Sequence, residues 1–434
     1  MKEAKAELQK IQSIPEQEFN AFLENKKQEI VEYHLQNNST YQKIVGKTTF
    51  NTWTDLPIMT KKDFQKPIIE RLSVGFSTKN VYVNKTSGSS GDPFIFAKDK
   101  FSHALTWAII INRFGWHGIN FNTSYQARFY GIPLDFIGNR KERLKDFLGN
   151  RFRFSIFDLS DKVLEDFLNE FKSRKFDYIN GYTSSIVLFA RFLQQKNIIL
   201  KTICPTLKVC IVTSEMLFAE DKILLEKQFG VPVVNEYGAS ELDLIAFQNT
   251  KGEWQVNSET LFVEILDENN TVLPYGKEGR IVITSLFNKA HPFIRYDIGD
   301  IGILDTKSTA KKPILQQLIG RTNDIAILPS GKKSPGLTFY YVTKSIIEDD
   351  GNVKEFVIKQ TKSDTFEIEY VSTTELNLEQ IQKIETAIAL YLEKGLIFTF
   401  IRKEKLERSK SGKLKQFISS LTPPLSKGEG VVSK

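Results

Sequence analysis

Hydroxyl side chains and glycines are crowded into one short segment, Thr86-Ser87-Gly88-Ser89-Ser90-Gly91. Glycine lets the backbone come close to a ligand, and successive backbone N–H groups in such a loop can surround an anion. The hydroxyl groups can donate further hydrogen bonds. The segment lacks the Gly-Lys-Ser/Thr ending of a Walker loop, and no helix pattern follows it. It predicts a phosphate-binding loop, with a flexible surface hairpin as the alternative.

Two later segments place a carboxylate near the end of an expected strand. In Asn235-Glu236-Tyr237-Gly238-Ala239-Ser240-Glu241, the tyrosine can stack on a planar base. The last glutamate of that segment can hold Mg²⁺ against a triphosphate, because Mg²⁺ takes few protein ligands. Pro292-Phe293-Ile294-Arg295-Tyr296-Asp297-Ile298-Gly299-Asp300 ends in an aspartate that can accept both hydroxyls of a ribose. Taken alone, each segment could equally be a turn with an ordinary acidic residue.

Two basic segments follow, Ile319-Gly320-Arg321-Thr322-Asn323-Asp324 and Arg408-Ser409-Lys410-Ser411-Gly412-Lys413. A lysine on a Ser-Gly turn is a mobile positive charge that can meet a carboxylate or a phosphate. Seven basic residues lie between Arg402 and Lys415, both included. A solvated basic tail or a patch that binds polyanions is therefore the alternative interpretation.

Strand and helix patterns alternate between residues 100 and 300, which favours an α/β architecture. We expect strands at 124–130, 207–213 and 232–237, and helices at 101–114 and 220–229. Strand patterns also flank the Gly/Ser segment on both sides, so it should connect the two strands of a hairpin. Between residues 261 and 284 only strand patterns occur.

The last hundred residues read as a separate α+β module. Strands are expected at 354–359, 366–371 and 396–401. Between the second and third, Asn377 and Gln380 have capping-box spacing at the start of a helix. A linker between Leu318 and Asn323 would join this module to the larger one.

Composition places the chain among ordinary globular proteins. It has 434 residues and a formal net charge of +7, a small excess for this length. The two cysteines, Cys204 and Cys210, lie in an apolar stretch and are expected to be buried and reduced. No signal-peptide pattern and no membrane-spanning run is evident, so a cytoplasmic protein is expected. The segment 423–434 is rich in Pro, Gly, Ser and Lys and predicts disorder.

Taken in order, the five motifs resemble those of the adenylate-forming superfamily of acyl-CoA synthetases, peptide-synthetase adenylation domains and luciferases. The resemblance spans about residues 81–415. Its closest form is the phenylacetate–CoA ligase branch, especially the members named for capsular polysaccharide biosynthesis, because of Arg295-Tyr296-Asp297-Ile298-Gly299-Asp300 and Gly320-Arg321-Thr322-Asn323-Asp324. The resemblance implies a large α/β adenylation domain (1–319), a small mobile α+β domain (320–422) and a tail (423–434).

The resemblance also implies roles for individual residues. The Thr86–Gly91 loop would hold the β- and γ-phosphates of ATP, and Lys413 would bridge the substrate carboxylate and the α-phosphate. Glu241 would ligate Mg²⁺ and act in catalysis, while Asn323 occupies the hinge position, where Asp or Lys is commoner. The remaining nucleotide-binding residues would contact the adenine and the ribose: Ser214, Glu215, Tyr237, Gly238, Ser240, Asp300 and Arg321.

The expected activity is ATP-dependent formation of an acyl-AMP, followed by transfer of the acyl group to CoA. Transfer to an amine or a carrier in surface-polysaccharide synthesis is an alternative that shares every motif, and a non-catalytic nucleotide-binding protein is another. No nucleic-acid partner is expected, and the resemblance to this branch suggests a homodimer. Tyr130, Tyr182 and Phe247 would favour an aromatic or apolar acyl group, although core packing explains them about as well.

Overall fold

The structure, a computed structural model, describes residues 1–421 except 47–49, 51, 87–93, 132–135, 157–158, 322–324, 332, 336–352, 392 and 409–413. The chain divides after Leu318 into two compact units, which we describe separately. The predicted domain limits stay predictions, and the tail 423–434 lies outside the described residues.

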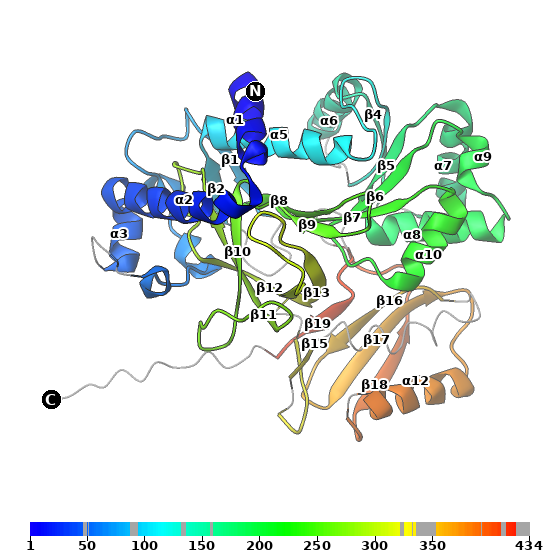
Figure 1. The fold of residues 1–434 in the computed structure, drawn as a ribbon. Coiled ribbons are helices and arrows are strands. Elements are labelled where there is room, and N and C mark those ends of the chain that lie inside the picture. Colours follow the sequence, from blue (N-terminus) through cyan, green and yellow to red (C-terminus); the bar gives the residue numbers. More distant parts are fainter. Residues whose placement is uncertain are drawn as a thin grey trace. The chain divides into compact units, whose positions relative to one another are not determined.

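A seven-stranded sheet forms the centre of the first unit (Figure 1). Its strand order is β4-β3-β5-β6-β7-β8-β9; neighbours from β4 to β7 pair in parallel, and β8 and β9 are antiparallel additions. The strands are β3 (Gln126–Phe129), β4 (Arg151–Phe154), β5 (Tyr178–Tyr182), β6 (Val209–Thr213), β7 (Val233–Ala239), β8 (Asp243–Gln248) and β9 (Trp254–Val256). Every residue of β5 and β6 is buried, as expected for central parallel strands covered on both faces. The predicted α/β class is confirmed.

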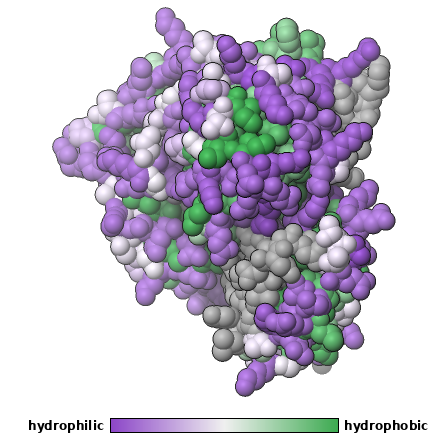
Figure 2. Space-filling view, turned by 90° about the vertical axis from the view of Figure 1, so that its right-hand side faces the viewer, coloured by the Kyte–Doolittle hydropathy of each residue, from purple (hydrophilic) through white to green (hydrophobic). Residues whose placement is uncertain are grey.

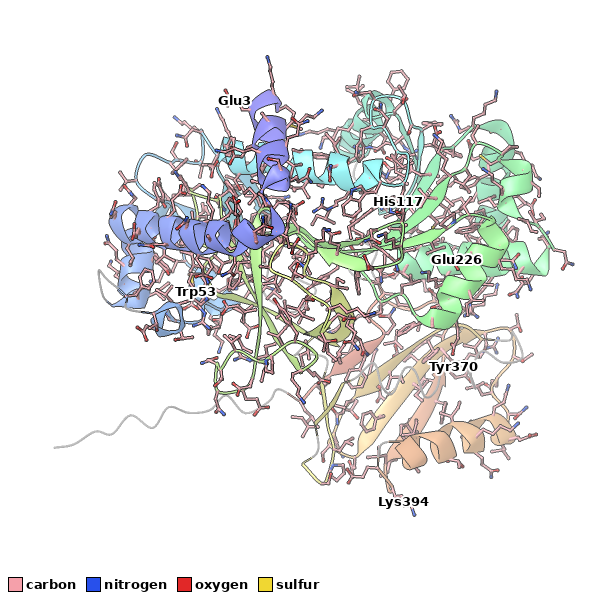
Figure 3. All side chains as sticks on the ribbon, viewed as in Figure 1. Glu3, Trp53, His117, Glu226, Tyr370 and Lys394 are labelled. Carbon is pink, nitrogen blue, oxygen red and sulfur yellow. The ribbon has the colours of Figure 1, made fainter. Side chains whose placement is uncertain are left out.

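Helices cover both faces of this sheet. They are α5 (Lys100–Gly115), α6 (Phe136–Leu148), α7 (Asp161–Ser173), α8 (Thr183–Gln195), α9 (Leu200–Ile203) and α10 (Ala219–Phe229). On one face, Phe154 and Phe189 belong to a core rich in phenylalanine that joins α7, α8 and α10 to the strands. On the other face, Ile109 of α5 packs with Ile211 of β6. His117, just beyond α5, donates from Nε2 to the carbonyl oxygen of Gln248 on β8 at 2.8 Å (Figure 3).

The N-terminal segment and a second sheet complete this unit. The helices are α1 (Lys2–Ser13), α2 (Glu16–Asn37), α3 (Ser39–Val45) and α4 (Ile68–Arg71), with 3-10 turns η1 (Trp53–Asp55) and η2 (Lys61–Phe64). The second sheet has the order β10 (Leu261–Leu266), β11 (Glu278–Ser285), β12 (Tyr296–Leu304) and β13 (Leu315–Arg321). Leu56 and Phe64 lie in one core with Ile283 of β11, so the N-terminal segment packs against this sheet.

The predicted hairpin around the Gly/Ser segment is confirmed. Strands β1 (Tyr82–Lys85) and β2 (Ile95–Lys98) pair in antiparallel register, with Lys85 opposite Ile95. Thr86 closes the hairpin, because its N–H donates to Phe94 O at 3.0 Å and its hydroxyl accepts from Phe94 N at 3.0 Å. The loop itself, 87–93, lies outside the described residues.

The second unit contains the expected β-β-α-β order, preceded by two short strands and followed by a third that were not predicted. It contains β14 (Ile325–Ile327), β15 (Lys333–Pro335), β16 (Val353–Gln360), β17 (Thr365–Ser372), α12 (Leu378–Tyr391), β18 (Ile397–Arg402) and β19 (Phe417–Ser419). The capping box is confirmed: Asn377 N donates to Gln380 Oε1 at 2.8 Å, and Gln380 N donates to Asn377 Oδ1 at 2.9 Å. β19 was not predicted; it pairs in parallel with β16.

The two cysteines are free and buried, as predicted. Burial raises the pKa of the Cys210 thiol well above its ordinary value, so this side chain behaves as a packed apolar group.

Candidate active site

Most of the predicted nucleotide-binding residues that the structure describes stand at one edge of the central sheet. β6 ends at Thr213, directly before Ser214, and β7 carries Tyr237 close to its own end. β6 and β7 are parallel neighbours, with Thr213 opposite Glu236, so their carboxyl ends meet at this edge. In open α/β sheets, ligands bind outside the carboxyl ends of the strands. The location is therefore suited to a bound nucleotide.

A buried hydrogen bond joins two motifs that are far apart in sequence. The Tyr237 hydroxyl donates to Asp300 Oδ2 at 2.6 Å, and both side chains are buried. Asp300 lies on β12, so this bond links the central sheet to the second sheet. It orients the tyrosine ring relative to the carboxylate.

Glu241 accepts a hydrogen bond from the Tyr296 hydroxyl at 3.1 Å. Burial, together with the neighbouring Glu241 carboxylate, raises the pKa of Tyr296 far above its ordinary value, so the tyrosine remains a donor. Within the described parts of the chain, no group of three or more His, Cys, Asp or Glu side chains could hold a metal ion. A single carboxylate nevertheless fits Mg²⁺, which keeps waters and takes phosphate oxygens as its other ligands.

The turn that carries Glu241 is held in place by Lys98 of β2. Lys98 Nζ forms an ion pair with Asp243 and donates to Ser240 O at 3.3 Å. Thr106 of α5 adds a bond to Asp243 Oδ2 at 2.7 Å. Sequence reasoning missed Lys98, Thr106 and Asp243, because none of them belongs to a motif. Asp243 lies 145 residues after Lys98 and 137 residues after Thr106 in the sequence.

Gly238 has a structural reason to be glycine. A Cβ atom there would lie 2.6 Å from the carbonyl oxygen of Asp243, where β7 and β8 shift register. Ser214 adopts a positive φ of 70°, directly after β6. These two positions let the chain turn sharply at the edge where the nucleotide-binding residues gather.

Glu215 contacts the start of α8. The backbone N–H of Ser184 donates to Glu215 Oε2 at 2.7 Å, and the Thr183 hydroxyl donates to Glu215 O at 3.3 Å. A carboxylate at a helix N-terminus is favoured by the helix dipole. The predicted contact of Glu215 with adenine stays a prediction.

Several predicted residues fall outside what the structure describes. These are Ser87, Gly88, Ser89, Ser90, Gly91, Asn323 and Lys413. Arg321 lies at the end of β13, but its side chain is not described. Phe247, expected near the acyl group, is fully buried and stacks on Phe114 with the two ring centroids 5.2 Å apart, so it belongs to the core.

Tyr237→Phe is expected to raise the KM for ATP about tenfold, since a hydrogen bond to a charged group contributes roughly 1.5–3 kcal/mol. The variant removes the bond that aligns the ring with Asp300. Initial rates across ATP concentrations measure the effect. Tyr41→Phe is the matched control, because the buried Tyr41 hydroxyl forms no hydrogen bond with any described residue. An unchanged KM in Tyr237→Phe would contradict a role for this bond in ATP binding.

No helix among the described residues is long and apolar enough to cross a membrane. The face drawn in Figure 2 is largely hydrophilic and carries several hydrophobic patches, the most prominent of them in its upper half.

Comparison with known proteins gives two curated relatives and many solved structures. Protein CapK of Staphylococcus aureus is 23% identical over 319 residues, which cover 68% of this chain and 66% of that protein. A phenylacetate-coenzyme A ligase of Aromatoleum evansii is 25% identical over 173 residues, covering 36% of this chain and 38% of the ligase. The chain therefore matches less than two thirds of the length of either relative. No family model matches.

A 2-hydroxyisobutyryl-CoA ligase, solved in the postadenylation state with an acyl-AMP, superposes with a TM-score of 0.71. The superposition covers 94% of this chain and 90% of that chain at 14% identity. An open form of the same ligase, with an acyl-AMP and CoA, superposes with a TM-score of 0.57. The chain thus has the fold of the adenylate-forming CoA ligases. The two curated matches confirm the predicted resemblance to the phenylacetate–CoA ligase branch.

Proposed function

We propose that this chain, which has the fold of the adenylate-forming CoA ligases, activates a carboxylic acid with ATP. The acid would form an acyl-AMP with release of pyrophosphate, and the acyl group would then pass to CoA. The observation that carries this proposal is the buried bond between Tyr237 and Asp300, with Glu241 four residues from the tyrosine. The relatives named for CoA ligation, and the solved ligase with its acyl-AMP, support it.

The described residues have distinct tasks in this reaction. The Tyr237 ring would stack on the adenine while its hydroxyl stays bound to Asp300, whose carboxylate would accept from the ribose hydroxyls. Glu241 would supply the protein ligand for Mg²⁺, which would offset the charge of the phosphates. Tyr296 would hold the Glu241 carboxylate in orientation.

Two further sequence motifs complete the proposal. The Thr86–Gly91 loop would bind the β- and γ-phosphates, and Lys413 would lie between the substrate carboxylate and the α-phosphate. The attacking carboxylate is already ionised, so no general base is required. Stabilising the negative charge of the transition state is the main task of the protein.

The alternative acceptors, an amine or a carrier thiol, share this first half-reaction. The match to Protein CapK does not separate them from CoA. Steady-state AMP release that requires CoA would favour the ligase, whereas AMP release that requires an amine would favour the alternative. A homodimer also stays a prediction, and sedimentation equilibrium would measure it.

The test is pyrophosphate release from ATP and Mg²⁺ across aryl, fatty, hydroxy and dicarboxylic acids. We expect at least one acid to stimulate release and Glu241→Gln to lower kcat roughly 100-fold, the usual cost of losing one group that stabilises transition-state charge. Glu226→Gln, a change at an exposed carboxylate of α10, is the matched control (Figure 3).

Full activity in Glu241→Gln would contradict the role of this carboxylate. If the wild type binds ATP but releases no pyrophosphate with any acid of the panel, the ligase activity is contradicted. That result would favour a nucleotide-binding protein without catalysis.

A further inference from the structure

A group of polar side chains lies at the carboxyl edge of the central sheet and has no role in the reaction steps proposed above. We call it the polar cluster: Arg128, Tyr130, Asn180, Tyr182, Thr213 and Glu236. The parallel register places Arg128 opposite Asn180, Tyr182 opposite Thr213, and Thr213 opposite Glu236. Residues opposite one another in parallel strands share a face, and alternate residues along each strand return to it. The cluster therefore occupies one face, and Glu236 directly precedes Tyr237.

The neighbours of Arg128 use their polar groups within the protein. Asn180 Oδ1 accepts from Gln126 at 3.1 Å and from the Tyr130 hydroxyl at 3.4 Å, and Asn180 Nδ2 donates to Ile211 O at 3.2 Å. On β4, Arg153 pairs with Asp146 at 2.7 Å and with Glu142 at 2.9 Å. These groups are satisfied and need no ligand.

Arg128 differs from them. It makes no ion pair and no hydrogen bond with any described residue, and its buried Nε has no acceptor. Its guanidinium lies over the Tyr130 ring, 4.2 Å from the centroid, which orients the group without neutralising it. Burial lowers the pKa of Arg128, and the nearby charges of Arg151 and Arg153 lower it further, whereas Tyr130 and Asp146 act in the opposite direction.

Glu236 lies near Arg128 but forms no ion pair with it. Burial raises the pKa of its carboxyl group to about 7, although the Thr213 hydroxyl and the Arg128 charge both favour the ionised form. Near neutral pH the protonated form is therefore populated, and it can donate to a ligand oxygen. A cation without a partner beside a carboxyl group that can donate favours an anionic ligand.

We propose that the acid activated by this protein is a dicarboxylic acid, whose second carboxylate binds Arg128 and the neighbouring Glu236 carboxyl group. This inference rests on the proposed function, since it names the acid that the site accepts. It replaces the expectation of an apolar acyl group. Three aromatic residues supported that expectation, and one of them, Phe247, lies in the core. The other two, Tyr130 and Tyr182, pack on each other beside Arg128, with their ring centroids 4.7 Å apart.

The experiment compares each dicarboxylic acid of three to six carbons with the monocarboxylic acid of the same length. Wild-type protein should release pyrophosphate with one dicarboxylic acid at a kcat/KM at least ~100-fold above that of its partner, because sites built to bind a polar group reject analogues without it. Arg128→Met should bring this ratio close to one. Arg174→Met is the matched control, since Arg174 also lies over a phenyl ring, that of Phe152, at 4.3 Å.

Binding is measured separately by the shift in thermal unfolding temperature that each acid causes in the presence of ATP. A dicarboxylic acid that raises the unfolding temperature of the wild type but not that of Arg128→Met supports the inference. It does so even if no pyrophosphate is released, because the lack of pyrophosphate would contradict only the proposed function. Equal activity with both members of every pair, or a preference that survives in Arg128→Met, overturns the inference and leaves the ligase activity standing. If Arg128→Met fails to fold, the wild-type comparison still decides between these outcomes.

Discussion

Replacement of Lys413 by alanine is expected to lower acid-dependent pyrophosphate release by roughly 100- to 1,000-fold, the usual effect of removing one group that stabilises transition-state charge. The reacting carboxylate and the triphosphate are both anions, so their approach requires a cation between them. A lysine supplies such a cation as a compact point charge at the end of a long side chain. The effect should fall mainly on the first half-reaction.

One measurement separates the half-reactions for this variant, and a second variant tests whether the effect is specific to Lys413. Lys413→Ala should still convert a chemically prepared acyl-AMP to the thioester when CoA is added, at a rate close to that of the wild type. Lys415→Ala, which removes a neighbouring positive charge from the same segment, should retain pyrophosphate release. Equal losses in both lysine variants would instead favour the interpretation of a general basic patch.

Arg113→Met is expected to destabilise the first unit by about 3–5 kcal/mol, the usual cost of leaving a buried charge without its partner. Arg113 Nη2 donates to Glu259 Oε2 at 2.6 Å, and both side chains are buried. Gln12 of α1 donates to the other carboxylate oxygen at 3.1 Å, so the pair joins α1, α5 and the segment before β10. Methionine fills much of the same volume but leaves Glu259 charged and desolvated.

Urea unfolding followed by tryptophan fluorescence measures this effect. All four tryptophans of the chain lie within residues 1–318, so the signal reports on the first unit. The double variant Arg113→Met, Glu259→Leu is the control, and it should be more stable than Arg113→Met because no charge remains unpaired. A double variant as unstable as the single one would show that packing, rather than charge, causes the loss.

The pH dependence of this pair has a definite sign. Burial alone would raise the pKa of Glu259, but the charge and hydrogen bond of Arg113 and the bond from Gln12 outweigh it, so the pKa is lowered. The pair therefore contributes its full stability above the unfolded-state value of about 4.3 and loses it as pH falls through the lower folded-state pKa. The difference between wild type and Arg113→Met should be largest near neutral pH and above, and should shrink in acid, where Glu259 becomes protonated.

Local patterns predicted much of the fold. The strands on either side of the Gly/Ser segment, the helix capped by Asn377 and Gln380, and the buried cysteines all follow from residues close together in sequence. Parallel strands covered on both faces leave continuous apolar runs such as Val209–Thr213, and these are visible without a structure. The short β19 was missed because three residues carry too little pattern.

The sequence by itself determined which residues could bind a nucleotide, because a motif depends on residue type and spacing within a few positions. Only the tertiary structure decided which of them meet: the Tyr237–Asp300 bond spans 63 residues, and the Lys98–Asp243 pair spans 145. Such contacts depend on strand order and register, which arise when whole sheets pack together. For the same reason, the position of Arg128 in the sequence could not reveal that its guanidinium forms no ion pair with any residue that the structure describes.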